Sequence, residues 1–202
     1  DTQTAALVSR RGSIDWLCVP RFDSGACFAA LLGEPRHGRW SIGPDLPEGD
    51  VRAVRRRYRG DTLVLETEVE TTCGTFRLVD CMPPRRGNPH VIRLVEGVSG
   101  RVPLRMELVL RCDYGSIVPW VQQRAGRLGA IAGPDAFVLD SGVPTRGEEL
   151  TTVARFEVTP GRRVPFVLAW HRSCDPQPPP ALDDTEPAGV AASAIEETAR
   201  WW

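Results

Sequence analysis

The chain has 202 residues, a formal net charge of −1 and a hydrophobic fraction of 42%. These values fit one folded domain, or one domain with an appendage, and they exclude a disordered chain. The near-neutral charge gives no reason to expect a nucleic-acid partner or binding to an anionic membrane. No apolar run approaches the roughly 18 residues of a membrane-spanning helix, and the first residues form no signal peptide. We therefore expect a cytoplasmic protein.

Two compositional biases stand out. All 25 basic residues are arginine. Guanidinium groups can recognise phosphate or carboxylate, but these are scattered along the whole chain, so codon bias of a GC-rich genome is the simpler explanation. The 19 glycines and 18 prolines, together with few aromatic residues, indicate tight turns between many short strands.

The N-terminal half is predicted to form strands joined by tight turns. Arg11 and Gly12 lie between two apolar segments, which is a hairpin signal. Gly74 provides another turn. The short segment 27–32, Cys-Phe-Ala-Ala-Leu-Leu, is the one predicted helical turn in this part. The predicted strands are residues 4–9, 13–19, 63–70 and 75–82.

The clearest strand is residues 102–112, in which apolar residues alternate with Arg105, Glu107 and Arg111. It follows a strand at 90–96 through a predicted turn at 97–100. Alternation of this kind is typical of antiparallel sheets with one buried face each, and two such sheets form a β-sandwich. The fold is therefore predicted as all-β. The further predicted strands are residues 120–123, 128–132, 137–139, 152–158 and 164–170.

The pattern changes after His171. A proline-rich stretch predicts a linker over 174–185, and a helix is predicted over 186–202. Two tryptophans end this helix, and such large apolar groups normally need cover. We expect the chain to continue and the helix to begin another domain, with 1–173 as the sandwich; the alternative is a helix packed back onto the sandwich. The predicted apolar face comprises Ala191, Ala194, Ile195, Thr198, Trp201 and Trp202.

The cysteines and histidines do not predict a metal site. No cysteine pair has C-x-x-C spacing, and no histidine is placed in a zinc-like pattern. Three disulfides in a secreted protein remain an alternative. Buried thiols are favoured, because Cys18, Cys81 and Cys112 lie in apolar strand patterns. No nucleotide-binding or nucleophile motif is present, so no cofactor is expected.

Carboxylates beside aromatic rings are the remaining candidates for chemistry. Hydrolysis of a glycosidic bond uses two carboxyl groups about 5 to 9.5 Å apart. Glu66, Glu68 and Glu70 share one strand face, which we interpret as a solvated face. An Asx turn at Asp23, capping the short helix expected after it, is favoured over a sugar-binding role. The candidates near aromatic rings are Asp15 with Trp16, and Arg21 with Phe22 and Asp23.

Residues 12–24, Gly-Ser-Ile-Asp-Trp-Leu-Cys-Val-Pro-Arg-Phe-Asp-Ser, closely resemble the N-terminal region of bacterial glycoside hydrolase family 15 proteins, the glucoamylase- and trehalase-like group. The resemblance continues in the same order along the whole chain. Its further segments are Asp1–Val8, Tyr58, Asp61–Thr67, Asp80 with Met82 and Pro83, Arg93–Val95 with Gly97, Asp113–Gly115, Pro165–Leu168, and Trp201 with Trp202.

This resemblance implies a supersandwich-like β-sandwich that precedes an (α/α)6 catalytic barrel, with a linker helix between them. Two glutamates of that barrel would hydrolyse an α-glucosidic bond with inversion, and trehalose, starch or another α-glucoside could be the substrate. The chain is then truncated at both ends, contains no catalytic residue, and is inactive alone. The implied partners are its own C-terminal barrel and, through that barrel, the α-glucoside.

Under this resemblance, the loop 20–24 is a hypothesis for the rim of the active site. Internal stabilisation of the fold by the same residues is an equal alternative. A second function class is an independent carbohydrate-binding or interaction module. Such a module should expose a strip of aromatic rings, whereas Trp16, Trp40, Trp120 and Trp170 lie on separate predicted strands. The rim or interface candidates are Arg21, Phe22, Asp23, Asp15 and Trp16, and the interdomain-helix candidates are Trp201 and Trp202.

Overall fold

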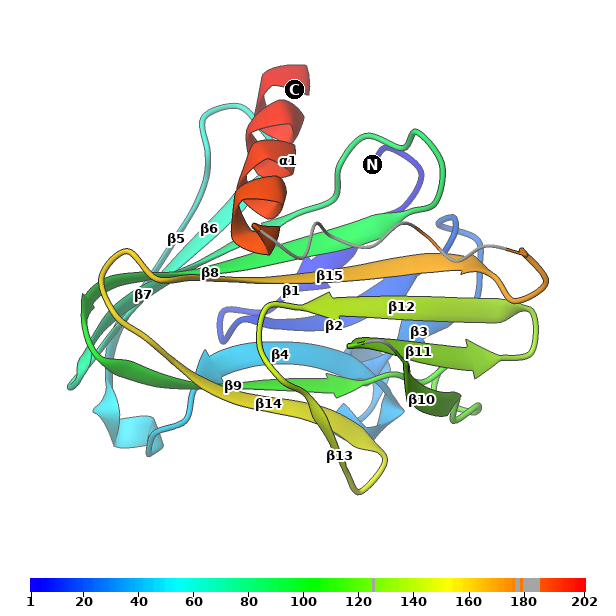
Figure 1. The fold of residues 1–202 in the computed structure, drawn as a ribbon, viewed down its shortest axis with the longest axis horizontal. Coiled ribbons are helices and arrows are strands. Elements are labelled where there is room, and N and C mark those ends of the chain that lie inside the picture. Colours follow the sequence, from blue (N-terminus) through cyan, green and yellow to red (C-terminus); the bar gives the residue numbers. More distant parts are fainter. Residues whose placement is uncertain (125, 177–178, 180–185) are drawn as a thin grey trace.

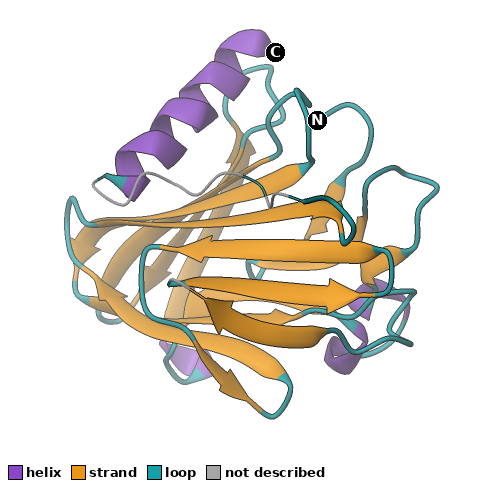
Figure 2. Cartoon of the chain, turned by 45° about the vertical axis from the view of Figure 1, so that its right-hand side comes forward, coloured by secondary structure: helices purple, strands orange, loops and turns teal. Residues whose placement is uncertain are grey.

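Two antiparallel sheets and a C-terminal helix make up the protein (Figure 1). The computed structural model describes residues 1–124, 126–176, 179 and 186–202. Within these residues the sheets face each other and the helix lies outside them (Figure 2). The predicted all-β sandwich with a C-terminal helix is confirmed. Of the predicted linker 174–185, residues 177–178 and 180–185 lie outside the described residues.

The smaller sheet has seven strands in the order β1-β2-β4-β9-β14-β13, with β3 paired to β2. The predicted hairpin around Gly12 is formed by β1 and β2. The strands are β1 (Ala6–Val8), β2 (Ser13–Cys18), β3 (Ala26–Phe28), β4 (Arg39–Pro44), β9 (Val102–Val109), β13 (Arg146–Glu148) and β14 (Thr151–Val158).

The larger sheet has eight strands in the order β10-β11-β12-β15-β8-β7-β6-β5. Three short 3₁₀ helices, η1 (Ala30–Leu32), η2 (Pro35–His37) and η3 (Glu48–Asp50), lie in connections. The strands are β5 (Val51–Tyr58), β6 (Leu65–Thr71), β7 (Gly74–Cys81), β8 (His90–Gly100), β10 (Trp120–Arg124), β11 (Arg127–Ala132), β12 (Asp135–Ser141) and β15 (Arg163–Arg172).

The main core fills the space between the sheets. On β9, Leu104 and Met106 are fully buried, while Arg105 between them points outward, as the period-two pattern predicts. Phe166 of β15 and Val95 of β8 supply the opposite wall. Burial of such side chains contributes about 25 cal/mol per Å² of apolar surface, so this layer dominates the stability of the sandwich.

One charged residue, Arg93 of β8, lies inside this core with none of its surface exposed. Its Nε donates to Asp80 Oδ1 of β7 (2.8 Å), its Nη1 to the carbonyl of Trp40 (2.5 Å) and its Nη2 to the carbonyl of Gly12 (2.7 Å). The guanidinium also lies 5.1 Å from the centre of the Trp40 ring. Arg93 therefore links the eight-stranded sheet to β4 and to the β1–β2 turn.

The helix α1 (Pro187–Trp201) packs on the outer face of the eight-stranded sheet, against β8 and β15, and in Figure 1 it rises from these strands. Its Ala191 and Ile195 join Ile92 and Leu94 of β8 in a second, smaller core cluster. The predicted helix is thus present, and the face that carries Ala191 and Ile195 packs back on the sandwich. Among the described residues, no helix is long and apolar enough to cross a membrane.

Two local predictions are wrong. Of the predicted helical turn 27–32, residues 27 and 28 belong to the strand β3, because Phe28 pairs with Leu17 of β2 and is buried; only 30–32 are helical. Residues 97–100 are the end of strand β8 rather than a turn, since Gly97 pairs with Phe76 and Gly100 with Gly74 of β7. The chain crosses between the two sheets only after Gly100.

The six cysteines are free thiols. Cys18, Cys27, Cys81 and Cys112 are buried, so the prediction of buried thiols holds for the three named from their strand patterns. Burial raises the pKa of the Cys81 and Cys112 thiols to about 12. Since the thiolate is the reactive form, these side chains behave as small apolar groups at neutral pH.

Candidate functional site

The loop 20–24 lies between β2 and β3 and exposes three adjacent side chains. Phe22 is 65% exposed. On either side of it, Arg21 and Asp23 form a two-point ion pair, in which Arg21 Nε donates to Asp23 Oδ1 (2.9 Å) and Nη2 donates to Oδ2. The backbone of the turn is closed by Ser24, whose Oγ accepts from the Arg21 N–H (3.1 Å). The structure therefore presents an aromatic ring beside a pre-formed ion pair.

The expectation that Asp23 caps a helix is wrong. The segment that follows it is the strand β3, so there is no helix terminus for it to cap. Instead, the hydrogen bond from Arg21 holds the pKa of the Asp23 carboxyl below its usual value. A carboxyl group that stays ionised at neutral pH is unsuited to act as a general acid.

Trp16 of β2 lies beside a second loop, at residues 113–115. Its ring centre is 6.0 Å from that of Tyr114, which is itself exposed. The Tyr114 N–H donates to the carbonyl of Ala26 (3.1 Å), which fixes this loop against β3. Both Asp113 and Tyr114 have positive φ angles, so the loop has an irregular backbone that its hydrogen bonds must hold. The contact between Trp16 and Tyr114 was not predicted.

The other sequence candidates have local or structural roles. Asp15 accepts a hydrogen bond from Ser13 Oγ (2.5 Å) on its own strand. Trp40 is fully buried, and Trp170 donates its indole N–H to Asp135 (2.8 Å). Of the four strand tryptophans, only Trp120, on β10, is largely exposed. They do not form an aromatic strip on one sheet face.

At the end of α1, Trp201 and Trp202 are 52% and 43% exposed. Their rings meet edge to face with centres 4.9 Å apart. A groove of about 580 Å³ lies between this helix and residues 83–90, and its lining includes Pro83, Ala194 and Trp201. The C-terminal end of the helix thus carries an apolar surface that the sandwich leaves uncovered.

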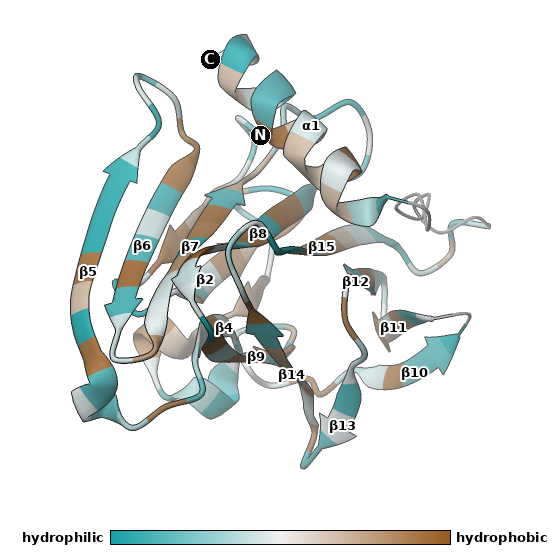
Figure 3. Cartoon of the chain, turned by 60° about the vertical axis from the view of Figure 1, so that its left-hand side comes forward, coloured by the Kyte–Doolittle hydropathy of each residue, from teal (hydrophilic) through white to brown (hydrophobic). Residues whose placement is uncertain are grey.

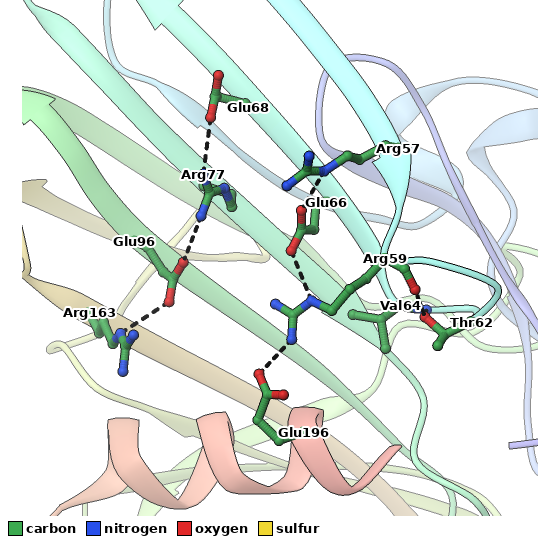
Figure 4. A network of polar contacts seen from close by, with 10 residues as sticks. All are labelled: Arg57, Arg59, Thr62, Val64, Glu66, Glu68, Arg77, Glu96, Arg163 and Glu196. Carbon is green, nitrogen blue, oxygen red and sulfur yellow. Dashed lines mark hydrogen bonds and ion pairs between the residues drawn. The ribbon is translucent and has the colours of Figure 1, made fainter. Parts of the chain in front are cut away.

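A network of ion pairs fixes the other side of α1 to the sheet (Figure 4). Arg59 donates to Glu66 (2.9 Å) and to Glu196 of the helix (2.6 Å), and Arg57 also donates to Glu66 (2.8 Å). Figure 4 shows a second chain of ion pairs on the same sheet face. Its members are Glu68, Arg77, Glu96 and Arg163.

The interpretation of the three β6 glutamates as a solvated face is wrong for Glu66, which is buried. Burial opposes ionisation of its carboxyl, but the hydrogen bonds from Arg57 and Arg59 outweigh that effect and lower its pKa. Its role is to connect β6 with Arg59, and through it with α1. No sequence signal near Glu66 identifies Glu196 as a member of the same network, because the two are far apart in the chain.

Within the described residues, no group of three or more His, Cys, Asp or Glu side chains could hold a metal ion. The arrangement offers two surfaces instead. One is the exposed loop 20–24. The other is the apolar end of α1.

Comparison with known proteins gives a consistent result. The family described as "Trehalase-like, N-terminal" matches residues 1–186. A trehalase of Mycolicibacterium smegmatis is 30% identical over 206 residues, covering 88% of this chain and 30% of that protein. One of Mycobacterium tuberculosis is 29% identical over 231 residues, covering 100% of this chain and 32% of that protein. One of Thermoplasma volcanium is 33% identical over 128 residues, covering 61% of this chain and 20% of that protein. The chain spans about a third or less of the length of these relatives.

Proposed function

Because the chain belongs to the trehalase-like N-terminal family, we propose that it is the non-catalytic N-terminal domain of an inverting α-glucoside hydrolase. Its relatives named trehalase are about three times as long as the matched region. The proposal assigns the catalytic glutamates to an (α/α)6 barrel that follows this chain, as in glycoside hydrolase family 15. Trehalose is the first substrate to test, and starch is the alternative.

The C-terminal helix is the proposed connection to that barrel. In this proposal residues 1–173 are the sandwich, 174–185 the linker and 186–202 the first helix toward the catalytic domain. The support is the unequal burial of α1: Ile195 is packed on the sheet, while Trp201 and Trp202 are exposed at its end. An apolar end of this kind favours a protein contact, because exposed tryptophans are enriched in interfaces.

The loop 20–24 is the proposed contribution to the rim of the active site. The observation that carries this role is the exposure of Phe22 beside the Arg21–Asp23 ion pair, in a loop whose backbone is fixed by Ser24. A fixed, exposed side-chain set is suited to position a substrate or a neighbouring domain, because little ordering is needed on contact.

The test uses the protein that joins this chain to the segment that follows it in the gene. Arg21→Ala is expected to lower kcat/KM for trehalose and to leave Tm unchanged, because the ion pair is exposed and adds little stability. Arg101→Ala is the matched control, since the Arg101 side chain is about as exposed as that of Arg21 and pairs with Glu157 (2.6 Å) on another part of the surface. A fall in Tm without a change in kcat/KM would assign the loop a structural role only.

A second experiment separates this role from an independent carbohydrate-binding module. The exposed Trp120 on β10 is the feature that favours such a module. Calorimetric titration of the 202-residue chain with maltose, trehalose and soluble starch is expected to show no saturable binding. Saturable binding that Trp120→Ala abolishes would support the module and contradict a purely supporting role.

A further inference from the structure

A third feature lies away from the loop 20–24 and from the apolar end of α1. A cleft of about 740 Å³ opens between the strands β5 and β6 of the larger sheet and β4 with the β1–β2 turn of the smaller sheet. In Figure 3, β5 and β6 form the left edge of the molecule and β4 lies near the centre. Its lining shares no described residue with the loop 20–24 or with α1.

One wall of the cleft is apolar. Val51 and Val54 of β5 are partly buried and pack against the main core, and Val69 of β6 lies beside them. Leu46, from the connection before β5, adds to this wall. The apolar surface is continuous with the core, so it can receive an apolar ligand group without rearrangement of the sheets.

The polar lining is strongly cationic. Five arginines and two glutamates line the cleft, which leaves three positive charges in excess. Glu48 pairs with Arg11 (2.7 Å), and Glu107 pairs with both Arg39 (2.7 Å) and Arg105 (2.8 Å). Arg105 also lies 3.7 Å from Glu148, which is outside the lining. The other two arginines, Arg10 and Arg52, form no ion pair within the part of the chain that the structure describes.

Three buried polar atoms in this lining lack a hydrogen-bond partner among the described residues: Thr67 Oγ1, Arg39 Nε and Arg105 Nε. Thr67, on the inner face of β6, is only 1% exposed. Buried polar atoms in folded proteins nearly always have a partner. The unpartnered hydroxyl of Thr67 therefore points to a polar ligand atom at this depth of the cleft.

We propose that this cleft binds an amphipathic organic anion, with its apolar part against Val51, Val54 and Val69 and its carboxylate beside Arg10 and Arg52. Arginine matches a carboxylate with two parallel hydrogen bonds. A neutral sugar fits less well, because it leaves the charges of Arg10 and Arg52 unmatched and because Phe76, the one aromatic ring among the described lining residues, is buried. The site is additional to the proposed supporting role.

The test is calorimetric titration of the 202-residue chain with octanoate, octan-1-ol and acetate. Octanoate is expected to bind saturably, octan-1-ol at least ten times more weakly, and acetate without saturation. Higher salt should weaken octanoate binding, because exposed charges contribute to it. Failure of octanoate to saturate overturns the proposal, as does binding of octan-1-ol with equal affinity.

Variants locate the site. Arg10→Gln with Arg52→Gln is expected to weaken octanoate binding at least fivefold and to leave Tm unchanged, because both side chains are exposed. The matched control is Arg124→Gln with Arg162→Gln, which removes two exposed arginines elsewhere and should not change the affinity. An equal loss in the control, or no loss in the first variant, would contradict the proposed site. Thr67→Val should weaken binding without lowering Tm, and unchanged binding would exclude the hydroxyl contact.

Discussion

Replacement of Arg93 by methionine tests the structural account of the sandwich. Methionine keeps most of the side-chain length but removes the three donors that contact Asp80, Trp40 and Gly12. Removing one partner of a buried ion pair costs about 3 to 5 kcal/mol, and each lost hydrogen bond to a carbonyl adds about 1 kcal/mol, although the Gly12 carbonyl keeps a second donor in the Ile42 N–H (3.1 Å). We therefore expect the free energy of unfolding to fall by about 5 kcal/mol or more.

A loss of this size is a large part of the roughly 5 to 15 kcal/mol by which domains are stable. For a chain of this length it corresponds to a fall in Tm of roughly 10 to 20 °C. The assay is urea unfolding followed by tryptophan fluorescence, with circular dichroism for Tm. Asp80→Asn should also cost about 3 to 5 kcal/mol, because the amide oxygen can still accept from Arg93 Nε but the buried guanidinium loses its counter-charge.

Arg101→Met is the control, because the Arg101 side chain is 71% exposed and its ion pair lies on the surface. It should change the free energy of unfolding by less than about 1 kcal/mol. If Arg93→Met lost less than about 2 kcal/mol, the conclusion that Arg93 links the two sheets would be refuted.

Three further predictions follow from packing, burial and backbone geometry. Ile195→Ala should cost about 2 to 4 kcal/mol in urea unfolding, whereas Glu196→Gln should cost less than about 1 kcal/mol because the Glu196 side chain is exposed; the reverse order would contradict the packing of α1. Burial lowers the pKa of His90 below its ordinary 6.5, so the unfolded state binds more protons than the folded state near this pH. The free energy of unfolding should therefore fall as the pH drops below 6.5. His90→Leu should flatten this slope between about pH 7.5 and 5.5, and an unchanged slope would exclude His90 as its source. Gly12→Ala should lower Tm more than Gly161→Ala, since both have positive φ but only at Gly12 would a Cβ lie 2.5 Å from a backbone oxygen; equal effects would show that φ alone decides the cost.

The long, one-sided strands were predictable from sequence. On β9 buried apolar residues alternate with less buried ones from Val102 to Leu108, so the strand and its buried face follow from the pattern. The strand ends at Val109 and not at the predicted residue 112. Residues 26–28 show no alternation, because all three are buried, and a short apolar run does not distinguish strand from helix. Gly97 was misinterpreted as part of a turn. It is a strand residue at a close contact, where a Cβ would lie 2.1 Å from the Thr159 carbonyl oxygen.

The candidate surfaces were only partly predictable. The motif 12–24 identified the loop, and its exposure agrees with a contact role, but the partner of Asp23 could not be inferred from an Asx-turn pattern. The network of Arg59, Glu66 and Glu196 joins three elements that meet only in the folded chain. The sequence around Thr67 is an ordinary strand pattern. Its unpartnered hydroxyl and its place in the cleft lining are therefore identified only from the structure.

The most direct measurement of the central claim is glucose release from trehalose by two proteins. One is the 202-residue chain alone, and the other is the same chain joined to the segment that follows it in the gene. The account predicts that only the joined protein releases glucose and that the chain alone is folded but inactive. Release of glucose by the chain alone, or none by the folded joined protein with trehalose or starch, would contradict it.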